Sequence, residues 1–561
     1  MRQILKNFGR KYWLGLLITL LLGWAAFLRF WTLRDQPYWM DEGFTVNAIL
    51  AVIHRGKTIL DSGEFYSCPT YCYPAAWIAN TFGQNAFSYR FLAALAGAIF
   101  IPVFFFTIRS ILRKKPRPDQ DEIEELSFRA FDGEKSPATK KFFGLFLAGR
   151  PTIIALLATF FIAFSYWQIA WSREARWYTL LELFSWLSVF FFWKFLARWF
   201  QQESPQGGEA IHRRLSLLSF SLGFLILAIS THAEAYLLIP IFAAWFCFKF
   251  FKTGQAKIQS KILLAILILL LSTTSIFLID KYSGHHFIMP LLQDLKIHYL
   301  LPYYLSFYLK HYWLFILPTI WLFLNLKNNH HRPQLVYLLS CVLAYFFAFG
   351  LFTDLLAYRY LFLITPALIL TGSYGIILLA EKFRYIYQKA AFFGVVIIIF
   401  FATGQGVLWP KAFYFLESDT KAASSNRPVY AYTPQPDWNT AYAFIKENRQ
   451  PGDLVISSNP VFTKIFLNEP GYWLEYPYLG IGDKCNYQTP DGREYYVGAK
   501  VIHSREDLAG LIRENNGYII IDHYSKSGRL APEIIKLIDE NTKAIFYNEK
   551  DYKSKIWIYK F

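Results

Sequence analysis

The sequence holds only five cysteines in 561 residues, and few of them point to a special role. Cys247 and Cys341 lie inside long apolar runs, so we interpret both as packing residues. Cys68 and Cys72 flank the tripeptide Pro-Thr-Tyr, where either a local disulfide or a pair of free thiols fits. Two cysteines alone do not make a metal site, and Cys485 has no evident partner.

Three further patterns are missing from the chain. Residues 410–561 have no glycine-rich phosphate loop, so we expect no nucleotide there. No clear internal repeat is present, which argues against a transporter built from paired repeats. The first apolar run is too long for a signal peptide and has no small-residue cleavage site, so we expect a retained signal anchor.

Apolar and aromatic residues are abundant. The chain is 55% hydrophobic and 20% aromatic, and many apolar runs reach the roughly 17–25 residues that a membrane helix needs. The formal charge of +17 comes from basic residues that cluster in short loops between these runs. The positive-inside rule explains that clustering, so we expect a polytopic α-helical membrane protein and no nucleic-acid partner.

The hydropathy pattern predicts about 11 transmembrane helices in residues 1–409. The N-terminus is expected in the cytoplasm because basic residues precede the first run. Residues 34–86 then form an exterior loop and residues 111–148 a cytoplasmic loop. The predicted spans are 12–33, 87–110, 151–171, 177–199, 215–231, 233–250, 262–280, 311–326, 335–352, 360–380 and 391–409.

Residues 410–561 alternate between helical and strand patterns. Asp437 and Ser504 each precede a stretch of helical spacing, as N-caps do. Gly517-Tyr-Ile-Ile-Ile-Asp is typical of a buried strand. The alternation predicts an extracytoplasmic α/β domain with a largely parallel sheet.

The pair Asp41-Glu42 follows the first apolar run, at the expected outer face of the membrane. A carboxylate so close to a bilayer is costly and usually has a partner or a task. The task that fits the pair is a general base for an acceptor hydroxyl or amine. The structural alternative is a salt bridge to Arg29, Arg34 or Arg55.

A second charged stretch is Ser172-Arg-Glu-Ala-Arg-Trp-Tyr, at the mouth of the third and fourth spans. If Glu174, Tyr178 and Glu182 continue one helix, their spacing puts them on one face. Arg173 or Arg176 then neutralises Glu182 or clamps a phosphate, and interfacial snorkelling of the arginines is the alternative.

Two more exterior elements carry polar groups. Arg359 and Tyr360 lie at the start of the tenth span. They are either part of an interfacial aromatic belt or ligands of a phosphate. His232 and Glu234 lie in the hinge between the fifth and sixth spans, where a satisfied loop histidine is the simpler interpretation. Acids and arginines at the outer surface suit a substrate linked to a lipid phosphate.

These segments, in this order, resemble the GT-C glycosyltransferases of family 39, which include protein O-mannosyltransferases and lipid A aminoarabinose transferases. The resemblance rests on Asp41-Glu42, on Phe82-Gly83 followed by Arg90, on Ser172-Arg-Glu-Ala-Arg-Trp-Tyr, and on Arg359-Tyr360 with Pro366. Family members commonly carry His-Pro-Pro-Leu where this chain has Cys68-Pro-Thr-Tyr-Cys, so no role of that histidine carries over. We expect this loop to stay extended because of Pro69 and Pro74.

The resemblance implies an inverting transferase in a cell membrane, plasma or inner, that takes a sugar from a polyprenyl-phosphate donor. The acceptor is an exterior protein, glycolipid or polysaccharide. Asp41 and Glu42 form the catalytic pair, with Asp41 as the base that deprotonates the acceptor and Glu42 or Glu174 orienting sugar hydroxyls or the arginines. The expected substrate-binding residues are Arg173, Glu174, Arg176, Tyr178, Arg359 and Tyr360.

No cofactor is expected, because the family generally works without a catalytic metal and no convincing metal cluster is present. A divalent metal site formed by the exterior histidines His285, His286 and His298 is the alternative. Two other functions fit a chain of this class. They are a flippase or transporter of a lipid-linked saccharide, and a non-catalytic scaffold whose outer domain binds partners.

Overall fold

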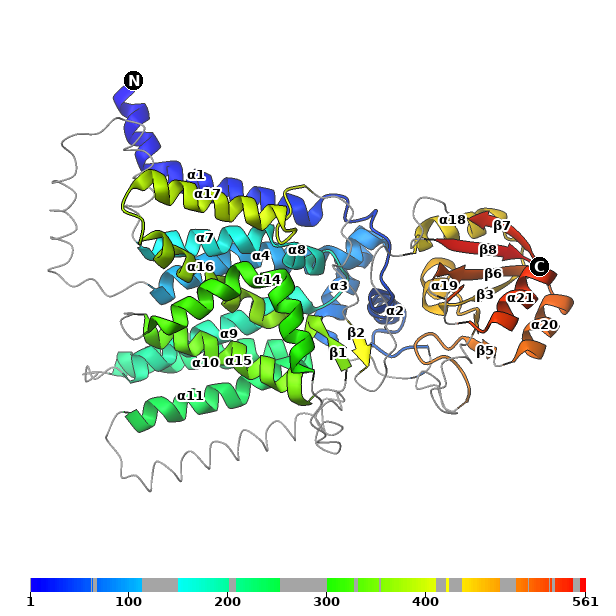
Figure 1. Ribbon diagram of the computed structural model, residues 1–561. Coiled ribbons are helices and arrows are strands. Elements are labelled where there is room, and N and C mark those ends of the chain that lie inside the picture. The colour runs from blue at the N-terminus through cyan, green and yellow to red at the C-terminus, as the bar shows by residue number, and fades with distance from the viewer. Residues whose placement is uncertain are drawn as a thin grey trace.

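A computed structural model describes most of the chain, and it shows a helical bundle joined to a smaller α/β domain (Figure 1). The residues described are 2–61, 63, 68–112, 150–200, 208–252, 300–326, 331–352, 355–409, 420–422, 436–474, 491–502, 504–523, 525–526, 530–547 and 555–561.

The bundle is built from long apolar helices. Within the described residues, seven helical stretches are long and apolar enough to cross a membrane, and three shorter apolar helices accompany them. The bundle elements are α1 (Arg2–Phe30), α4 (Ala86–Leu112), α7 (Arg150–Phe164), α8 (Tyr166–Ser172), α9 (Tyr178–Trp199), α10 (Gly208–Thr231), η1 (Ala233–Leu237), α11 (Leu238–Lys252), α14 (Leu301–Leu324), α15 (Arg332–Phe352), η3 (Tyr358–Ile364), α16 (Thr365–Ala380) and α17 (Ile386–Ala402).

The predicted membrane architecture is confirmed. Every predicted span coincides with a bundle helix except the seventh, 262–280, which lies outside the described residues. Small residues bring some of these helices close together, as is usual in membranes. A Cβ atom on Gly375 of α16 would lie 2.3 Å from the carbonyl oxygen of Pro318 in α14, so only glycine allows this contact.

The stretch predicted as the first exterior loop contains two helices, α2 (Met40–Arg55) and α3 (Pro69–Phe82). The expectation that Pro69 and Pro74 keep this stretch extended is wrong. Pro69 occupies the first turn of α3, where a missing N–H costs nothing. Cys68 and Cys72 form a disulfide across that turn, which settles the alternative in favour of a local disulfide.

The C-terminal α/β domain has a six-stranded sheet in the order β5-β4-β3-β6-β8-β7, in which neighbours pair parallel except at the two pairings of β8. All six residues of β6 are buried. Asp437 and Ser504 cap helices, as predicted. The elements are α18 (Trp438–Asn448), β3 (Leu454–Ser457), α19 (Pro460–Leu467), β4 (Tyr472–Leu474), β5 (Lys500–Ile502), α20 (Arg505–Glu514), β6 (Gly517–Asp522), α21 (Pro532–Asn541), β7 (Lys543–Tyr547) and β8 (Ile556–Lys560).

A short antiparallel pair, β1 (Leu355–Ala357) with β2 (Thr420–Ala422), lies at the same end of the bundle as α2 (Figure 1). β2 follows residue 409 in sequence and yet pairs with a strand of the bundle region. The predicted division of the chain at 409/410 stays a prediction.

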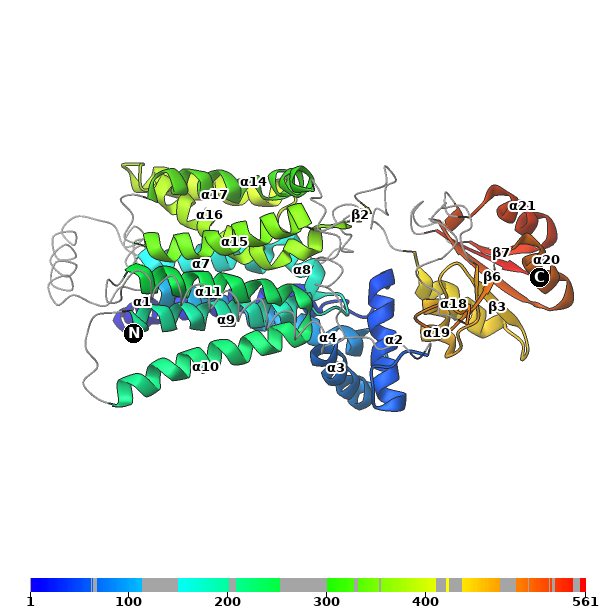
Figure 2. The ribbon, with the colours of Figure 1, turned by 90° about the horizontal axis from the view of Figure 1, so that it is seen from below.

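Helix α2 lies between the bundle and the α/β domain and contacts both (Figure 2). On the domain side, the Asn47 side-chain amide donates to the carbonyl oxygen of Val461 at 3.3 Å. The ring of Phe44 stacks on Tyr496 with centroids 3.7 Å apart. A Cβ atom on Gly43 would lie 2.7 Å from Val461 Cγ1, so α2 and α19 approach very closely here.

Candidate active site

Asp41 and Glu42 lie in the first turn of α2, the helix that joins the two parts of the molecule. Acidic residues at this position interact favourably with the positive end of the helix dipole. The Glu42 side chain also accepts a hydrogen bond from the backbone N–H of Trp39 at 3.3 Å, which caps the N-terminus of α2. Adjacent residues in a helix point about 100° apart, so the two carboxylates face different surroundings.

Glu42 is fully buried and held in place by several donors. Arg90 of α4 donates to it twice, from Nε to Oε1 at 2.5 Å and from Nη2 to Oε2 at 2.7 Å. The backbone N–H of Ala175 adds a third bond at 2.7 Å. A two-pronged arginine–carboxylate pair is rigid and strong, so the geometry suits an orienting role for Glu42.

Arg90 also ties down the chain that leads into α2. Its Nη1 and Nη2 atoms donate to the carbonyl oxygens of Leu33, Gln36 and Pro37 at 2.8–3.1 Å. Sequence reasoning did not identify this pairing, because Arg90 is 48 residues from Glu42. The available signal was an arginine near the start of a largely apolar helix.

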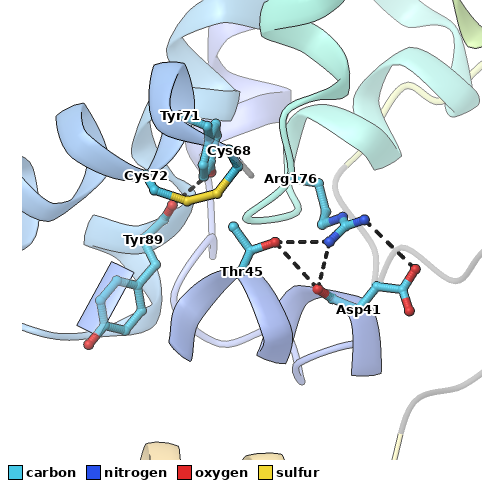
Figure 3. Close-up of a disulfide and its surroundings, with 7 residues drawn as sticks. All are labelled: Asp41, Thr45, Cys68, Tyr71, Cys72, Tyr89 and Arg176. Atoms are coloured by element: carbon cyan, nitrogen blue, oxygen red, sulfur yellow. Dashed lines mark hydrogen bonds and ion pairs between the residues drawn. A yellow bond between two sulfur atoms is a disulfide. The ribbon is translucent and has the colours of Figure 1, made fainter. Parts of the chain in front are cut away.

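Asp41 is the more accessible acid, with 19% of its side chain exposed. Its Oδ2 lies 3.4 Å from Nη2 of Arg359 and 3.9 Å from Nη2 of Arg176. Arg176 is fixed in turn by bonds from Nη1 to the Asp41 carbonyl and to Thr45 Oγ1, both at 2.9 Å (Figure 3). The carboxylate therefore lies beside two guanidinium groups from distant parts of the chain. These partners differ from Arg29, Arg34 and Arg55, the salt-bridge alternatives named from sequence.

Aromatic rings surround the two arginines. The Arg176 guanidinium lies 3.8 Å from the ring centroid of Trp177 and 5.8 Å from that of Tyr178. Arg359 lies 5.4 Å from the rings of Trp39 and Tyr360. Such contacts stabilise a cation where water is scarce. The structure thus brings Asp41, Arg176 and Arg359 together, with Tyr178 and Tyr360 beside them.

Arg173 and Glu174 contact a different region, the segment before α2. Arg173 Nη1 donates to the carbonyl oxygens of Trp31 at 2.6 Å and Leu28 at 3.1 Å, and burial lowers the pKa of its guanidinium to about 10. Glu174 accepts from Nε2 of Gln36 at 2.5 Å. Burial, then the nearby charge of Glu42, raises the pKa of the Glu174 carboxyl well above its ordinary value.

The expected continuous helix through Glu174, Tyr178 and Glu182 is wrong. Helix α8 ends at Ser172 and α9 begins at Tyr178, so Glu174 lies in the turn between them. Glu182 lies inside the bundle, where Gln168 Nε2 donates to its Oε1 at 2.6 Å, in place of the expected arginine. The turn is what allows Arg176 to reach α2.

No group of three or more His, Cys, Asp or Glu side chains within the described residues could hold a metal ion. His285, His286 and His298, which kept a metal site open, lie outside those residues.

Known proteins resemble this chain through one family model and several solved structures. Residues 69–255 match the family described as the protein O-mannosyl-transferase TMEM260 N-terminal domain. No curated protein matches the sequence.

Solved structures of membrane transferases superpose on nearly the whole chain. ArnT from Cupriavidus metallidurans bound to undecaprenyl phosphate has a TM-score of 0.52 at 12% identity and covers 98% of both chains. Its apo state has a TM-score of 0.53 at 11% identity, with 97% of both chains covered. The apo Archaeoglobus fulgidus oligosaccharyltransferase has a TM-score of 0.55 at 12% identity, covering 96% of this chain and 73% of its own.

The family match, over residues 69–255, is to a transferase domain, and the structural neighbours are themselves transferases. At 11–12% identity, the likeness to these structures shows the fold alone. The chain has the GT-C fold, and the resemblance predicted from its motifs is confirmed.

Proposed function

We propose that this protein transfers a sugar from a polyprenyl-phosphate donor to an acceptor on the outer side of a cell membrane. The observation that carries the proposal is the contact of the accessible Asp41 carboxylate with Arg176 and Arg359. A base and two cations at one point match the two needs of the reaction. The acceptor must lose a proton and the departing lipid phosphate must be stabilised.

The proposed reaction is a single displacement. The acceptor oxygen or nitrogen attacks the anomeric carbon, its proton passes to Asp41, and the bond to the phosphate oxygen breaks. Arg176 and Arg359 then bind the released phosphate. A double displacement needs a second accessible carboxylate as nucleophile, and Glu42 is held in its buried pair with Arg90. We therefore propose inversion at the anomeric carbon.

The structural likeness to ArnT bound to undecaprenyl phosphate supports the class of lipid carrier. The likeness to a protein O-mannosyl-transferase domain supports a protein hydroxyl as one acceptor class. A glycolipid and a polysaccharide are the other two classes to be assayed.

The test is sugar transfer by the purified full-length protein in nanodiscs, with a polyprenyl-phosphate sugar and a panel of acceptors. Asp41→Asn should lower kcat by about 10²–10⁴-fold, as loss of a general base does, with an unchanged unfolding midpoint. Product analysis should show the anomeric configuration opposite to that of the donor. Transfer by Asp41→Asn at the wild-type rate refutes the proposed base.

We also propose that the reaction needs no divalent cation, since the two guanidinium groups supply positive charge at the phosphate. Activity should be unchanged after dialysis against EDTA. Loss of activity that Mg²⁺ or Mn²⁺ restores would contradict this part of the proposal.

A further inference from the structure

His232 lies in the sharp turn between α10 and η1, close to the residues that surround Asp41. Its Nδ1 atom lies 3.1 Å from Oε1 of Glu234, whose side chain is fully buried. The backbone N–H of Glu234 donates a hydrogen bond to the same nitrogen at 3.4 Å. The backbone hydrogen bond to Nδ1 holds the imidazole ring in one orientation beside the buried carboxylate.

Two aromatic rings connect His232 to the arginines beside Asp41. The ring of Trp177 stacks on His232 at 5.4 Å, and the guanidinium of Arg176 lies 3.8 Å from the same ring. The ring of Tyr360 lies 6.5 Å from that of His232 and 5.4 Å from the guanidinium of Arg359. Each arginine therefore shares an aromatic neighbour with the histidine.

The charges of this group are also close enough to interact. Arg359 and Arg176 both act electrostatically on the Glu234 carboxylate. The site thus holds two acids, Asp41 and Glu234, near the same two guanidinium groups. Glu234 is engaged with His232, which leaves Asp41 as the acid that an acceptor can reach.

The second ring nitrogen of His232 is available to a ligand. The side chain is 19% exposed, and within the described part of the chain no hydrogen bond is made to Nε2. Because Nδ1 accepts the Glu234 backbone N–H, the ring carries its proton on Nε2. Nε2 is then an N–H donor on a partly exposed ring whose aromatic neighbours also contact the two arginines.

We infer that His232 is a third ligand of the donor phosphate, through Nε2, and that Glu234 is the positioning residue that orients it. This inference rests on the proposed function. When the bond from the anomeric carbon to the phosphate oxygen breaks, its electron pair stays on that oxygen, to which Nε2–H donates. The acceptor proton goes to Asp41, so His232 stabilises charge and transfers no proton.

The test compares binding of a C55 polyprenyl phosphate with binding of the uncharged C55 polyprenol, to full-length protein in nanodiscs. His232→Phe keeps the ring and its stacking but removes both nitrogens. It should weaken polyprenyl-phosphate binding about tenfold or more, as loss of a hydrogen bond to a charged group does. Polyprenol binding and the unfolding midpoint should not change.

Three further variants separate a phosphate contact from a packing role. His232→Gln keeps a donor near the place of Nε2 and should restore part of the affinity. Glu234→Gln removes the carboxylate and should weaken phosphate binding less than His232→Phe does. His212→Phe, at an exposed position in α10, is the matched control and should behave as wild type.

The outcomes distinguish this inference from the function on which it rests. If the wild type transfers sugar and His232→Phe binds polyprenyl phosphate as tightly as wild type, the inference is overturned and the function stands. If His232→Phe loses polyprenol and polyprenyl phosphate equally, the residue packs and does not bind phosphate. If the wild type neither binds polyprenyl phosphate nor transfers sugar, the proposed function fails first.

Discussion

At the scale of single residues, two adjacent acids have different surroundings and therefore different expected roles. The Glu42 side chain is fully buried in a pair with Arg90, whereas 19% of the Asp41 side chain is exposed beside two arginines. A single step along the helix separates a carboxylate that organises the structure from one that a substrate can reach. Substitutions at the two positions should fail in different ways.

Glu42→Gln should destabilise the protein by about 3–5 kcal/mol, because it leaves the Arg90 guanidinium buried without its counter-charge. Asp41→Asn should change the free energy of unfolding by less than about 1 kcal/mol, because its ion-pair distances are longer and it is partly solvated. Thermal unfolding of both variants in the same detergent measures the difference. Equal loss of stability in the two variants would contradict it.

A second residue-scale prediction concerns Glu494 in the α/β domain. Burial raises the pKa of its carboxyl from 4.5 to about 7, although backbone N–H groups of Tyr496 and Val497 donate to it and act in the opposite direction. The native state therefore keeps this proton at pH values where the unfolded chain has lost it. Stability falls as pH rises from about 4.5 to 7, by roughly 3 kcal/mol in total, and then levels off.

Glu494→Gln keeps an acceptor oxygen and should remove this decline. The measurement is the difference in unfolding free energy between variant and wild type across that pH range. Glu506→Gln, on an exposed helix face, serves as the control and should leave the difference flat. If the free energy of unfolding declines equally with pH in the wild type and in Glu494→Gln, Glu494 does not cause the decline.

At the scale of elements, hydropathy predicts the bundle well because each span must be long and apolar to cross a bilayer. The pattern does not predict which buried charges meet. Glu42 finds Arg90 on α4, and Arg176 reaches Asp41 only because the chain turns between α8 and α9. Helical spacing places Glu174 in a continuous helix, since periodicity carries no signal for a short turn. Helix α3 escapes prediction because its two prolines favour extended chain, whereas one of them suits a first helical turn.

Helix α2 gives an element-scale prediction at its contact with α19. Gly43→Val should cost about 1–3 kcal/mol, because its side chain overlaps Val461 and Phe462 at the closest approach of the two helices. The readouts are the unfolding midpoint and the rate at which protease cleaves the α/β domain.

A double-mutant cycle tests the same contact from both sides. Val461→Ala removes the methyl that meets a Cβ on Gly43, so Gly43→Ala should cost less in that background than alone. Gly223→Ala, with no neighbour within 4 Å, is the control. If the effects of Gly43→Ala and Val461→Ala on the free energy of unfolding are additive, Gly43 and Val461 are not in close contact.

At the scale of the whole molecule, the site and the α/β domain lie at one end of the bundle, and the N-terminus lies at the other (Figure 1). The basic loops predict that the site end is outside the cell. Lys536→Cys in the α/β domain should react with a membrane-impermeant maleimide in intact cells, and His212→Cys at the start of α10 should not. The unsubstituted chain gives the background. The reverse labelling pattern would invert the topology.

Asp41, Arg176 and Arg359, which lie together in the folded protein, are synthesised at very different times. Arg176 follows Asp41 by 135 residues, and Arg359 enters later still, with η3. Chains grow from the N-terminus, so a nascent protein carries the proposed base long before it has both of the proposed phosphate ligands. A ribosome product released before η3 should occupy membrane without consuming lipid-linked sugar. Under the proposed function, such a partial chain should neither bind the donor phosphate tightly nor transfer sugar.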